Sequence, residues 1–399
     1  MSELNFTHSN GNKVKLTTPD TLAASKTFKL PGADGSSGEV LKTDGSGALS
    51  FASVIAHPNM VINGGMIISQ RYYTNEFTPS PSPTNNRFTL DMMRYDMSQS
   101  SKFKVQQVTD SPAGFSHSMK VTSLSAYTSG TSDYFLLQNF IEGLNCARLG
   151  WGTSDAQTVT LSFYVKSSIE GVHACGIRNK DYNRSKTETY TINNANTWEY
   201  KTVTFTGDTS GSWNTDRNSG LKINFDIGSG SGFEAASTGT WLATNDFITS
   251  NSVKIVGTNG ATWYITGLQL QVGDIATPFE HRDYEDEIRR CERYYQNSFS
   301  YGNIPGTSTD YADSVITTSW TDSNIPFANP FKVEMRVAPT VTLRPRGSTT
   351  TGRVNHGGSD VVASAQQIGT KNIAYIANTG GSSAGQFNAY TYELFADLD

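Results

Sequence analysis

The segments VTLSFYV (Val159–Val165) and LKINFDI (Leu221–Ile227) decide the fold class of this 399-residue chain. In both segments, large apolar residues alternate with polar ones, which is the pattern of a β-strand with one face in a core. The alternation predicts that Phe163 and Phe225 point into that core. The residues predicted to point outward are Thr160, Ser162, Tyr164, Lys222, Asn224 and Asp226.

Further strands of the same kind surround these two segments. EYKTVTF (Glu199–Phe205) is predicted to bury Val203 and Phe205. In WYITGLQLQV (Trp263–Val272) the apolar positions change parity at Gly267, which predicts a β-bulge there. Many short strands separated by loops rich in Gly, Asn and Ser favour an all-β fold with a jelly-roll β-sandwich.

The composition argues against several classes of protein. Charged residues make up 17% of the chain, whereas about a quarter is usual for globular proteins. The net charge is −5 and the longest basic run is Arg289-Arg290, so we expect no nucleic-acid partner. The first 25 residues contain no apolar leader, and no run of about 18 apolar residues occurs, so membrane insertion is not expected.

The cysteines indicate neither redox nor metal chemistry. Cys146, Cys175 and Cys291 are odd in number and far apart, and no C-x-x-C motif occurs. The pattern therefore predicts neither a disulfide framework nor a zinc site. We expect no catalytic metal and no cofactor. A structural Ca²⁺ at Asp208, Asp216 and Asp226 stays open, although no ligand loop with EF-hand spacing occurs.

Four segments of the chain differ in character. Residues 1–57 carry short alternations broken by Gly and Asp turns, too short for a core of their own, so this segment is either flexible or ordered by pairing with other copies. Residues 58–282 contain the predicted sandwich, and residues 299–399 form a second β domain with fewer large apolar residues. Three copies around one axis would supply the core that this second domain lacks, which favours a homotrimer.

Residues 283–298 are predicted to form a connecting helix that runs from Asp283 to about Asn297. Asp283 is a suitable N-cap residue. Apolar or aromatic side chains at i, i+4, i+7 and i+11 mark one face for burial. That stripe consists of Tyr284, Ile288, Cys291 and Tyr295.

Three patterns bear on catalysis, and we predict no catalytic residue from them. GSSAG (residues 381–385) has the G-x-S-x-G spacing of a hydrolase nucleophile, but β-like segments flank it, which indicates a hairpin loop. FEHR (Phe279–Arg282) lies where a strand meets the helix, which favours structural ion pairs over acid–base chemistry. Glu188 and Glu199 would suit a glycosidase only at a separation that a sequence does not give.

Sugar binding requires an exposed aromatic platform among polar side chains, and two loops each supply a candidate. GSWNTDRNSG (Gly211–Gly220) contains Trp213, and STGTWLATND (Ser237–Asp246) contains Trp241. An exposed Trp calls for an explanation, because its ring buries a large apolar area. Trp213 and Trp241 are therefore the candidate glycan-binding residues. The alternative is that they plug the ends of the sandwich or a trimer seam.

Several blocks resemble one family of proteins. LPGADGSSGEVLKTDGSGALSF (Leu30–Phe51) resembles the N-terminal connector of tail fibres and other virion fibre proteins of tailed bacteriophages, especially marine phages and cyanophages. Four further blocks are similar to other parts of the same phage proteins, so the resemblance spans nearly the whole chain. They are NMVINGGMIISQR (Asn59–Arg71), NTWEYKTVTFTGDTSGSW (Asn196–Trp213), TGLQLQVGDIATPFEHRDYEDEIRRCERYYQ (Thr266–Gln296) and FKVEMRVAPTVTL (Phe331–Leu343).

The resemblance implies a trimeric fibre or spike with a jelly roll like that of carbohydrate-binding modules. It implies a structural protein, made in the host cytoplasm and carried on the virion tail or capsid. Residues 1–57 would anchor it to other virion proteins, and another part would adsorb to a host-surface glycan or receptor.

Two alternatives stay open. One is a head fibre or decoration protein on the capsid without a receptor role. The other is a glycan-cleaving tail spike, although such spikes usually rest on long β-helices with short repeats, and this sequence has none. We therefore expect that the protein is not an enzyme.

Overall fold

The chain forms two compact units, Met1–His57 and Pro58–Asp399. Its fold is mostly β and sandwich-like. Neither α-helix in the described part of the chain has the length and apolar character needed to cross a bilayer. The computed structural model describes residues 3–7, 13–17, 27–35, 39–43, 46–53, 59–81, 88–306, 313–320, 323–379 and 385–398.

The first unit contains two separate antiparallel hairpins. β1 (Glu3–Thr7) pairs with β2 (Lys13–Thr17), and β3 (Glu39–Thr43) pairs with β4 (Leu49–Ser53). Among the side chains of this unit whose burial is described, none is fully buried, and Leu30 is 76% exposed. The described part of this unit therefore has no apolar core of its own.

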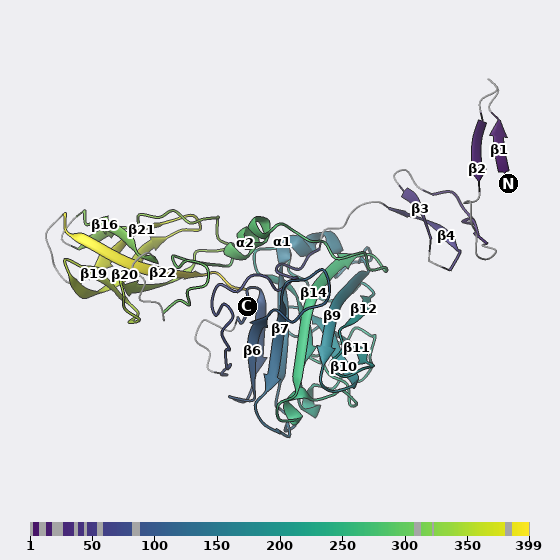
Figure 1. The fold of residues 1–399 in the computed structure, drawn as a ribbon, viewed down its shortest axis with the longest axis horizontal. Coiled ribbons are helices and arrows are strands. Elements are labelled where there is room, and N and C mark those ends of the chain that lie inside the picture. Colours follow the sequence, from purple (N-terminus) through teal and green to yellow (C-terminus); the bar gives the residue numbers. More distant parts are fainter. Residues whose placement is uncertain are drawn as a thin grey trace. The chain divides into compact units, whose positions relative to one another are not determined.

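The second unit contains a sandwich of two five-stranded antiparallel sheets, and Figure 1 shows the second of these sheets toward the viewer. The first sheet has the order β11 (Ser185–Ile192), β10 (Gly171–Arg178), β13 (Ser219–Asp226), β8 (Phe135–Glu142) and β5 (Met93–Met97). The second sheet has the order β12 (Glu199–Phe205), β9 (Val159–Ser167), β14 (Thr262–Val272), β7 (Ser118–Ser123) and β6 (Phe103–Val108). The short helical segments of the sandwich are α1 (Gly143–Cys146), η1 (Ala147–Leu149), η2 (Ser231–Phe233) and η3 (Ile255–Gly257).

The predicted inner faces of the strands are confirmed. Phe163 of β9 and Phe225 of β13 are fully buried, and their ring centroids lie 5.1 Å apart in an edge-to-face contact. This contact joins the two sheets. Val203 and Phe205 of β12 are buried in the same core, as predicted. Burial of each such side chain contributes about 1.5–3 kcal/mol.

The predicted bulge in β14 is also present. The pairing of β14 with β9 shifts register between Thr266 and Gln269. Gly267 lies between them with φ of +63°, and a Cβ atom there would lie 2.8 Å from the ring of Phe115 and 3.0 Å from the ring of Tyr164. Only glycine fits this position without strain or displacement. The shift lets apolar residues of both parities in β14 point into one core.

The outward prediction for β13 is wrong about exposure. Lys222, Asn224 and Asp226 do point away from the core, but they are 1%, 0% and 2% exposed. The reason is a second covering layer, since Phe233 and Phe247 from the segment that follows β13 pack over this face of the sheet. Thr160 and Ser162 of β9 are likewise buried.

The connecting helix is shorter than predicted. α2 runs over Tyr284–Glu292, and the side chain of its N-cap residue Asp283 makes no capping hydrogen bond. Tyr295 is not helical because it begins β15 (Tyr295–Asn297), which pairs with β22 (Phe387–Phe395). The long-range ladder therefore overrides the helical periodicity of the local sequence.

The buried face of α2 contacts its own chain. Cys291 and Ile288 pack in one cluster with Phe140 of β8. Tyr284, which was predicted to share that face, is 44% exposed. The buried face of α2 is therefore used within one copy of the chain.

The C-terminal β domain has its own core, which includes Tyr390, Tyr392 and Leu394, so the expectation that one copy of this domain lacks a core is wrong. Apolar side chains such as Trp320 and Val362 remain exposed on it, at 62% and 48%. Its eight-stranded sheet has the order β15, β22, β19 (Arg353–His356), β20 (Ser359–Ile368), β21 (Ile373–Asn378) and β17 (Asn324–Pro326), while β16 (Val315–Thr318) and β18 (Thr340–Pro345) also pair with β22.

Guanidinium groups connect the sandwich to the C-terminal β domain and to the segment that leads into it, and we call this set of contacts the joint. Arg217 of the sandwich donates to the carbonyl oxygen of Arg336 at 3.2 Å. Arg71 bonds to both carboxylate oxygens of Asp397 at 2.7 Å, Arg293 bonds to both oxygens of Glu142 at 2.8 and 2.7 Å, and Arg336 donates to the carbonyl oxygen of Arg217 at 2.8 Å.

Candidate functional site

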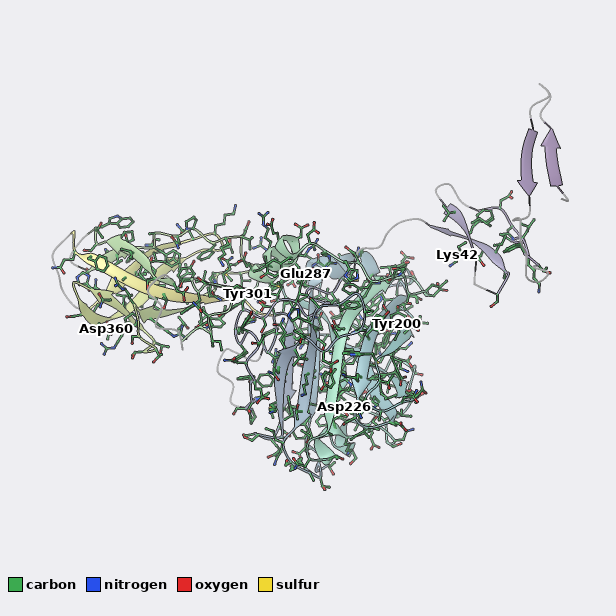
Figure 2. The ribbon with its side chains drawn as sticks, viewed as in Figure 1. Lys42, Tyr200, Asp226, Glu287, Tyr301 and Asp360 are labelled. Carbon is green, nitrogen blue, oxygen red and sulfur yellow. The ribbon has the colours of Figure 1, made fainter. Side chains whose placement is uncertain are left out.

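A cleft of about 270 Å³ lies on the outer face of the first sheet. We call it the outer-face cleft. Strands β5, β8 and β10 supply its floor, and the turn after β10 and the segment after β13 supply its walls. Figure 2 labels Asp226, the last residue of β13 in this same sheet. The lining residues are Arg94, Asp96, Tyr134, Leu136, Arg178, Tyr182, Phe233, Asn245 and Phe247.

Arg178, at the end of β10, is the more deeply buried of the two arginines that line the cleft, at 2% exposure. Its Nε and Nη2 donate to Oδ1 of Asn224 at 3.2 and 3.0 Å, and its Nη1 donates to Oδ1 of Asn245 at 2.5 Å. The guanidinium carbon lies 4.5 Å from the ring centroid of Phe247 and 5.1 Å from that of Tyr182. Burial lowers its pKa to about 10. Neutral amides and aromatic rings therefore hold this charge in place.

Two more cations lie close to Arg178. Arg94 of β5 is 9% exposed, its guanidinium lies 5.1 Å from the ring centroid of Phe140, and its buried Nε has no hydrogen-bond partner among the described residues. The ammonium group of Lys222 lies 3.8 Å from the ring centroid of Tyr182. Asp96 is the one carboxylate among the lining residues. The side chains around the cleft therefore carry an excess of positive charge.

Aromatic rings form the walls of the cleft. Tyr134, Tyr182 and Phe233 are half-buried, and Phe233 stacks on Phe247 with ring centroids 4.7 Å apart. Tyr182 has φ of +57°, an uncommon conformation for a residue other than glycine. The side chain of Asn179 holds this turn by accepting two backbone N–H groups at 3.1 Å. The turn thus keeps the Tyr182 ring in a fixed position.

The two predicted glycan-binding tryptophans lie elsewhere. Trp213 and Trp241 pack edge to face with each other at 5.4 Å and with Trp151 at 4.7 and 5.2 Å between centroids. Their indole N–H groups donate to Asp208 at 3.0 Å and to the carbonyl oxygen of Thr206 at 2.8 Å. Both rings are half-buried against the sandwich core, and neither lines the outer-face cleft. Their role as a glycan platform stays a prediction.

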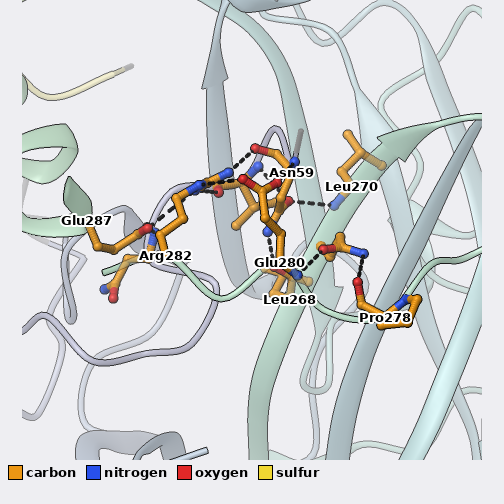
Figure 3. A network of polar contacts seen from close by, with 10 residues as sticks. Asn59, Leu268, Leu270, Pro278, Glu280, Arg282 and Glu287 are labelled. Atoms are coloured by element: carbon orange, nitrogen blue, oxygen red, sulfur yellow. Dashed lines mark hydrogen bonds and ion pairs between the residues drawn. The ribbon is translucent and has the colours of Figure 1, made fainter. Parts of the chain in front are cut away.

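Glu280 and Arg282 of the FEHR motif belong to the polar network drawn in Figure 3. Arg282 donates to Glu280 at 3.2 Å, to Glu287 of α2 at 3.3 Å and to the carbonyl oxygen of Val61 at 3.0 Å. The backbone N–H of Asn59 in turn bonds to Glu280. These contacts fasten the segment near Asn59 to the connection between β14 and α2, and they confirm the predicted ion pairs.

The other catalytic candidates are not assembled into one site. Glu188 lies 3.9 Å from Lys186, and burial raises its pKa. Glu199 is bonded instead to Lys201 and Asn193. Residues 380–384, most of the GSSAG string, lie outside the described residues. Within the described ranges, no group of three His, Cys, Asp or Glu side chains could hold a metal ion.

The sequence analysis missed the outer-face cleft, although one signal for it was present. FLLQNFIE (Phe135–Glu142) is apolar at both parities, which is typical of a strand covered on both faces. All eight of its residues are buried. The strand register aligns its Gln138 with Arg94 on one side and Asn224 on the other, a polar row across the sheet.

Comparisons with known proteins give no family. No protein-family model matches the chain, and no curated protein matches it. Solved structures give likenesses of low identity. One is the enzymatically active domain of tailspike protein 4 of bacteriophage CBA120, with a TM-score of 0.29 and 12% identity over 54% of this chain. The match spans 21% of that tailspike domain.

Two further likenesses are of similar strength. The family 11 carbohydrate-binding module of Clostridium thermocellum, solved with a β-1,3-1,4-mixed-linked tetrasaccharide, matches with a TM-score of 0.26 and 13% identity over 52% of this chain and 98% of its own. An arabinose-bound α-L-arabinofuranosidase matches with a TM-score of 0.28 and 12% identity over 59% of this chain and 33% of its own. At such TM-scores the likenesses identify no function.

Proposed function

We propose that this protein binds a glycan on a host surface through the outer-face cleft, and that it does so as a fibre or spike of a bacteriophage virion. The observation that carries the binding proposal is the cleft itself. Its half-buried rings of Tyr134, Tyr182 and Phe233 offer apolar faces to the C–H side of a sugar. Arg178 and Asn245 offer polar groups for hydroxyl or acidic oxygens.

The size of the cleft suits a short piece of a glycan. Its volume of about 270 Å³ lies just below the range of roughly 300–1,000 Å³ that is usual for drug-sized ligands. The polar floor is fixed before any ligand arrives, because Asn224 and Asn245 already hold the Arg178 guanidinium. A preformed site loses less conformational freedom on binding.

The fibre role is supported by the sequence blocks that resemble phage fibre proteins and by the separate unit of residues 1–57. In this proposal, that unit attaches the protein to other virion proteins, and a homotrimer presents three clefts. The C-terminal domain exposes Trp320 and Val362, which a subunit contact would cover. A head fibre without a receptor role and a glycan-cleaving spike are the alternatives that experiments have to separate.

The binding proposal is tested with the purified full chain on a glycan array. We expect binding of a defined set of glycans, and we expect Tyr182→Ala to abolish it while Tyr200→Ala, which alters a ring outside the cleft, leaves it intact. Binding that survives Tyr182→Ala would contradict the cleft as the site. Release of reducing ends from a bound glycan would instead favour the glycan-cleaving spike.

The fibre proposal is tested on assembly. Light scattering at micromolar concentration should give a trimer, and a monomer would contradict the fibre. A chain that begins at Pro58 should fold but fail to enter virions, and normal incorporation would contradict an anchoring role for residues 1–57. Labelling of the protein on virions distinguishes tail from capsid.

A further inference from the structure

The outer-face cleft is lined by two arginines and by one carboxylate, Asp96, whose charge raises the pKa of Arg178 but does not outweigh the effect of burial. Arg94 and Arg178 both line it, and neither makes an ion pair with a carboxylate among the residues that the structure describes. Arg71 differs in this respect, because it is 3% exposed and bonds to both carboxylate oxygens of Asp397.

Burial without a counter-charge is unfavourable for a cation. Moving a guanidinium out of water weakens its solvation, and only a paired anion restores most of that free energy. Arg178 is 2% exposed and its oxygen partners belong to the neutral amides of Asn224 and Asn245. Cation–π contacts with Phe247 and Tyr182 offset part of the loss. The rest of the lost solvation free energy is not recovered, so the buried charge of Arg178 does not stabilise the fold.

The donor geometry is suited to an anion. A guanidinium carries five N–H donors, and the hydrogen bonds of Arg178 use three of them. Arg94 also keeps a buried Nε without a hydrogen-bond partner among the described residues. Forked N–H donors match the paired oxygens of a carboxylate, sulfate or phosphate group better than the single oxygen of a hydroxyl.

We propose that the outer-face cleft is specific for acidic glycans, with the anionic group of one sugar bound by Arg178 and Arg94 and its ring set between the aromatic walls. This inference rests on the proposed glycan binding and names the class of sugar. Carboxylated sugars such as uronic acids, sulfated sugars and phosphorylated sugars share the required chemistry.

The test begins with an array that carries carboxylated, sulfated, phosphorylated and neutral glycans. We expect the glycans bound by the full chain to be acidic. A set of mainly neutral glycans would overturn this inference and leave the proposed function standing. If no glycan of any class binds, the proposed function fails and this inference falls with it.

The second step removes only the anionic group. The best-bound glycan is carboxyl-reduced, desulfated or dephosphorylated, according to the group it carries. We expect the neutral counterpart to bind at least about tenfold more weakly, since charge-assisted bonds are about twice as strong as neutral ones. Equal affinity for both counterparts would overturn the inference.

The third step changes the cations. Arg178→Gln and Arg94→Gln should each weaken binding of the acidic glycan by about tenfold or more, while Arg289→Gln on the exposed face of α2 should leave affinity unchanged. Arg178→Lys keeps the positive charge but loses the forked N–H donors of the guanidinium. Its affinity for the acidic glycan should lie between those of wild type and Arg178→Gln.

Melting temperature separates a binding role from a structural one. Because an unpaired buried cation does not stabilise the fold, Arg178→Gln should keep or raise the melting temperature. If Arg178→Gln does not fold, the melting temperature and the glycan affinity of Arg94→Gln decide between a binding role and a structural role. Unchanged affinity for the acidic glycan in folded variants of both arginines would overturn the inference.

Discussion

The two faces of strand β13 are both buried, yet they differ in chemistry. One face carries Leu221, Ile223 and Phe225, each fully buried in the sandwich core. The other carries Asn224, which accepts hydrogen bonds from Arg178 and Gln138 under the covering segment. The inner face is what an apolar core requires. The outer face carries a row of buried polar residues. Well-packed apolar residues of similar size at these positions would give a fold of equal stability.

The comparison separates two uses of burial in one strand. Apolar burial on the inner face stabilises the fold through area removed from water. Polar burial on the outer face gives little net stability, but it fixes donors and rings in a defined geometry. The following changes test this division and then the tryptophan cluster outside β13, from the largest expected effect to the smallest.

The inner face should be the more sensitive to truncation. Phe225→Ala removes the ring that meets Phe163 between the sheets and should lower the free energy of unfolding by about 3–5 kcal/mol. The matched control is Tyr200→Ala, because Tyr200 is 45% exposed on β12. Chemical denaturation measures both. If the two variants lose similar stability, the inner-face assignment is wrong.

On the outer face, removal of one polar partner should destabilise more than removal of two. Asn224→Ala leaves donors of Arg178 and Gln138 without their acceptor and should cost about 2–3 kcal/mol. The double variant Arg178→Met, Asn224→Leu should recover much of that loss, because it removes the buried charge as well. If the losses of unfolding free energy in a double-mutant cycle are additive, Arg178 and Asn224 are not energetically coupled, which would contradict this prediction.

Two buried groups should give opposing pH dependence. Burial raises the pKa of Asp226 to about 6, so its contribution to stability is present below about pH 4 and is lost as pH rises through 6. Burial lowers the pKa of His173 to about 4, so its contribution is present above about pH 6.5 and is lost as pH falls toward 4. The two effects oppose each other between pH 4 and 6.

Asp226→Asn should therefore expose the His173 effect. In this variant, unfolding free energy should rise between pH 4 and 6 by on the order of 2 kcal/mol more than in wild type. Asp133→Asn is the control, because hydrogen bonds from Tyr127 and Ser98 outweigh burial and lower the pKa of Asp133 to about 2, below this window. An unchanged slope in Asp226→Asn would show that Asp226 is not buried as described.

The smallest effect is expected outside β13, at the tryptophan cluster. Trp241→Ala removes edge-to-face contacts with Trp151 and Trp213 and should cost about 1–2 kcal/mol. Trp320→Ala, at a 62% exposed position, should have almost no effect on stability. If Trp241→Ala abolishes glycan binding while Tyr182→Ala does not, the tryptophans are the platform and the outer-face cleft is not.

The sequence predicted what local periodicity encodes. The inner faces of β9, β12 and β13 follow from a period of two, and the bulge follows from a parity change at Gly267. Exposure of the opposite face was mispredicted, because Phe233 and Phe247 reach it from a loop without periodicity. The helix was extended too far because the pairing of Tyr295 with Phe395 is a contact between residues far apart in the chain.

The cleft could not be predicted from local periodicity either, because it is formed by residues far apart in the chain. Arg94 and Arg178 belong to β5 and β10, which are separated in the first sheet by β8 and β13. Each looks like an ordinary polar position within its own strand. Only the strand order brings them to one site, and strand order is set by the global topology.

The joint has a mechanical consequence. Guanidinium groups of the joint bond at separate points, to Asp397, to Glu142 and to the carbonyl oxygen of Arg217. A movement that separates the bonded groups has to break charge-assisted hydrogen bonds, which are about twice as strong as neutral ones. The joint therefore resists such a movement. A pull on the sandwich is transmitted to the C-terminal β domain through several parallel attachments rather than through the covalent chain alone.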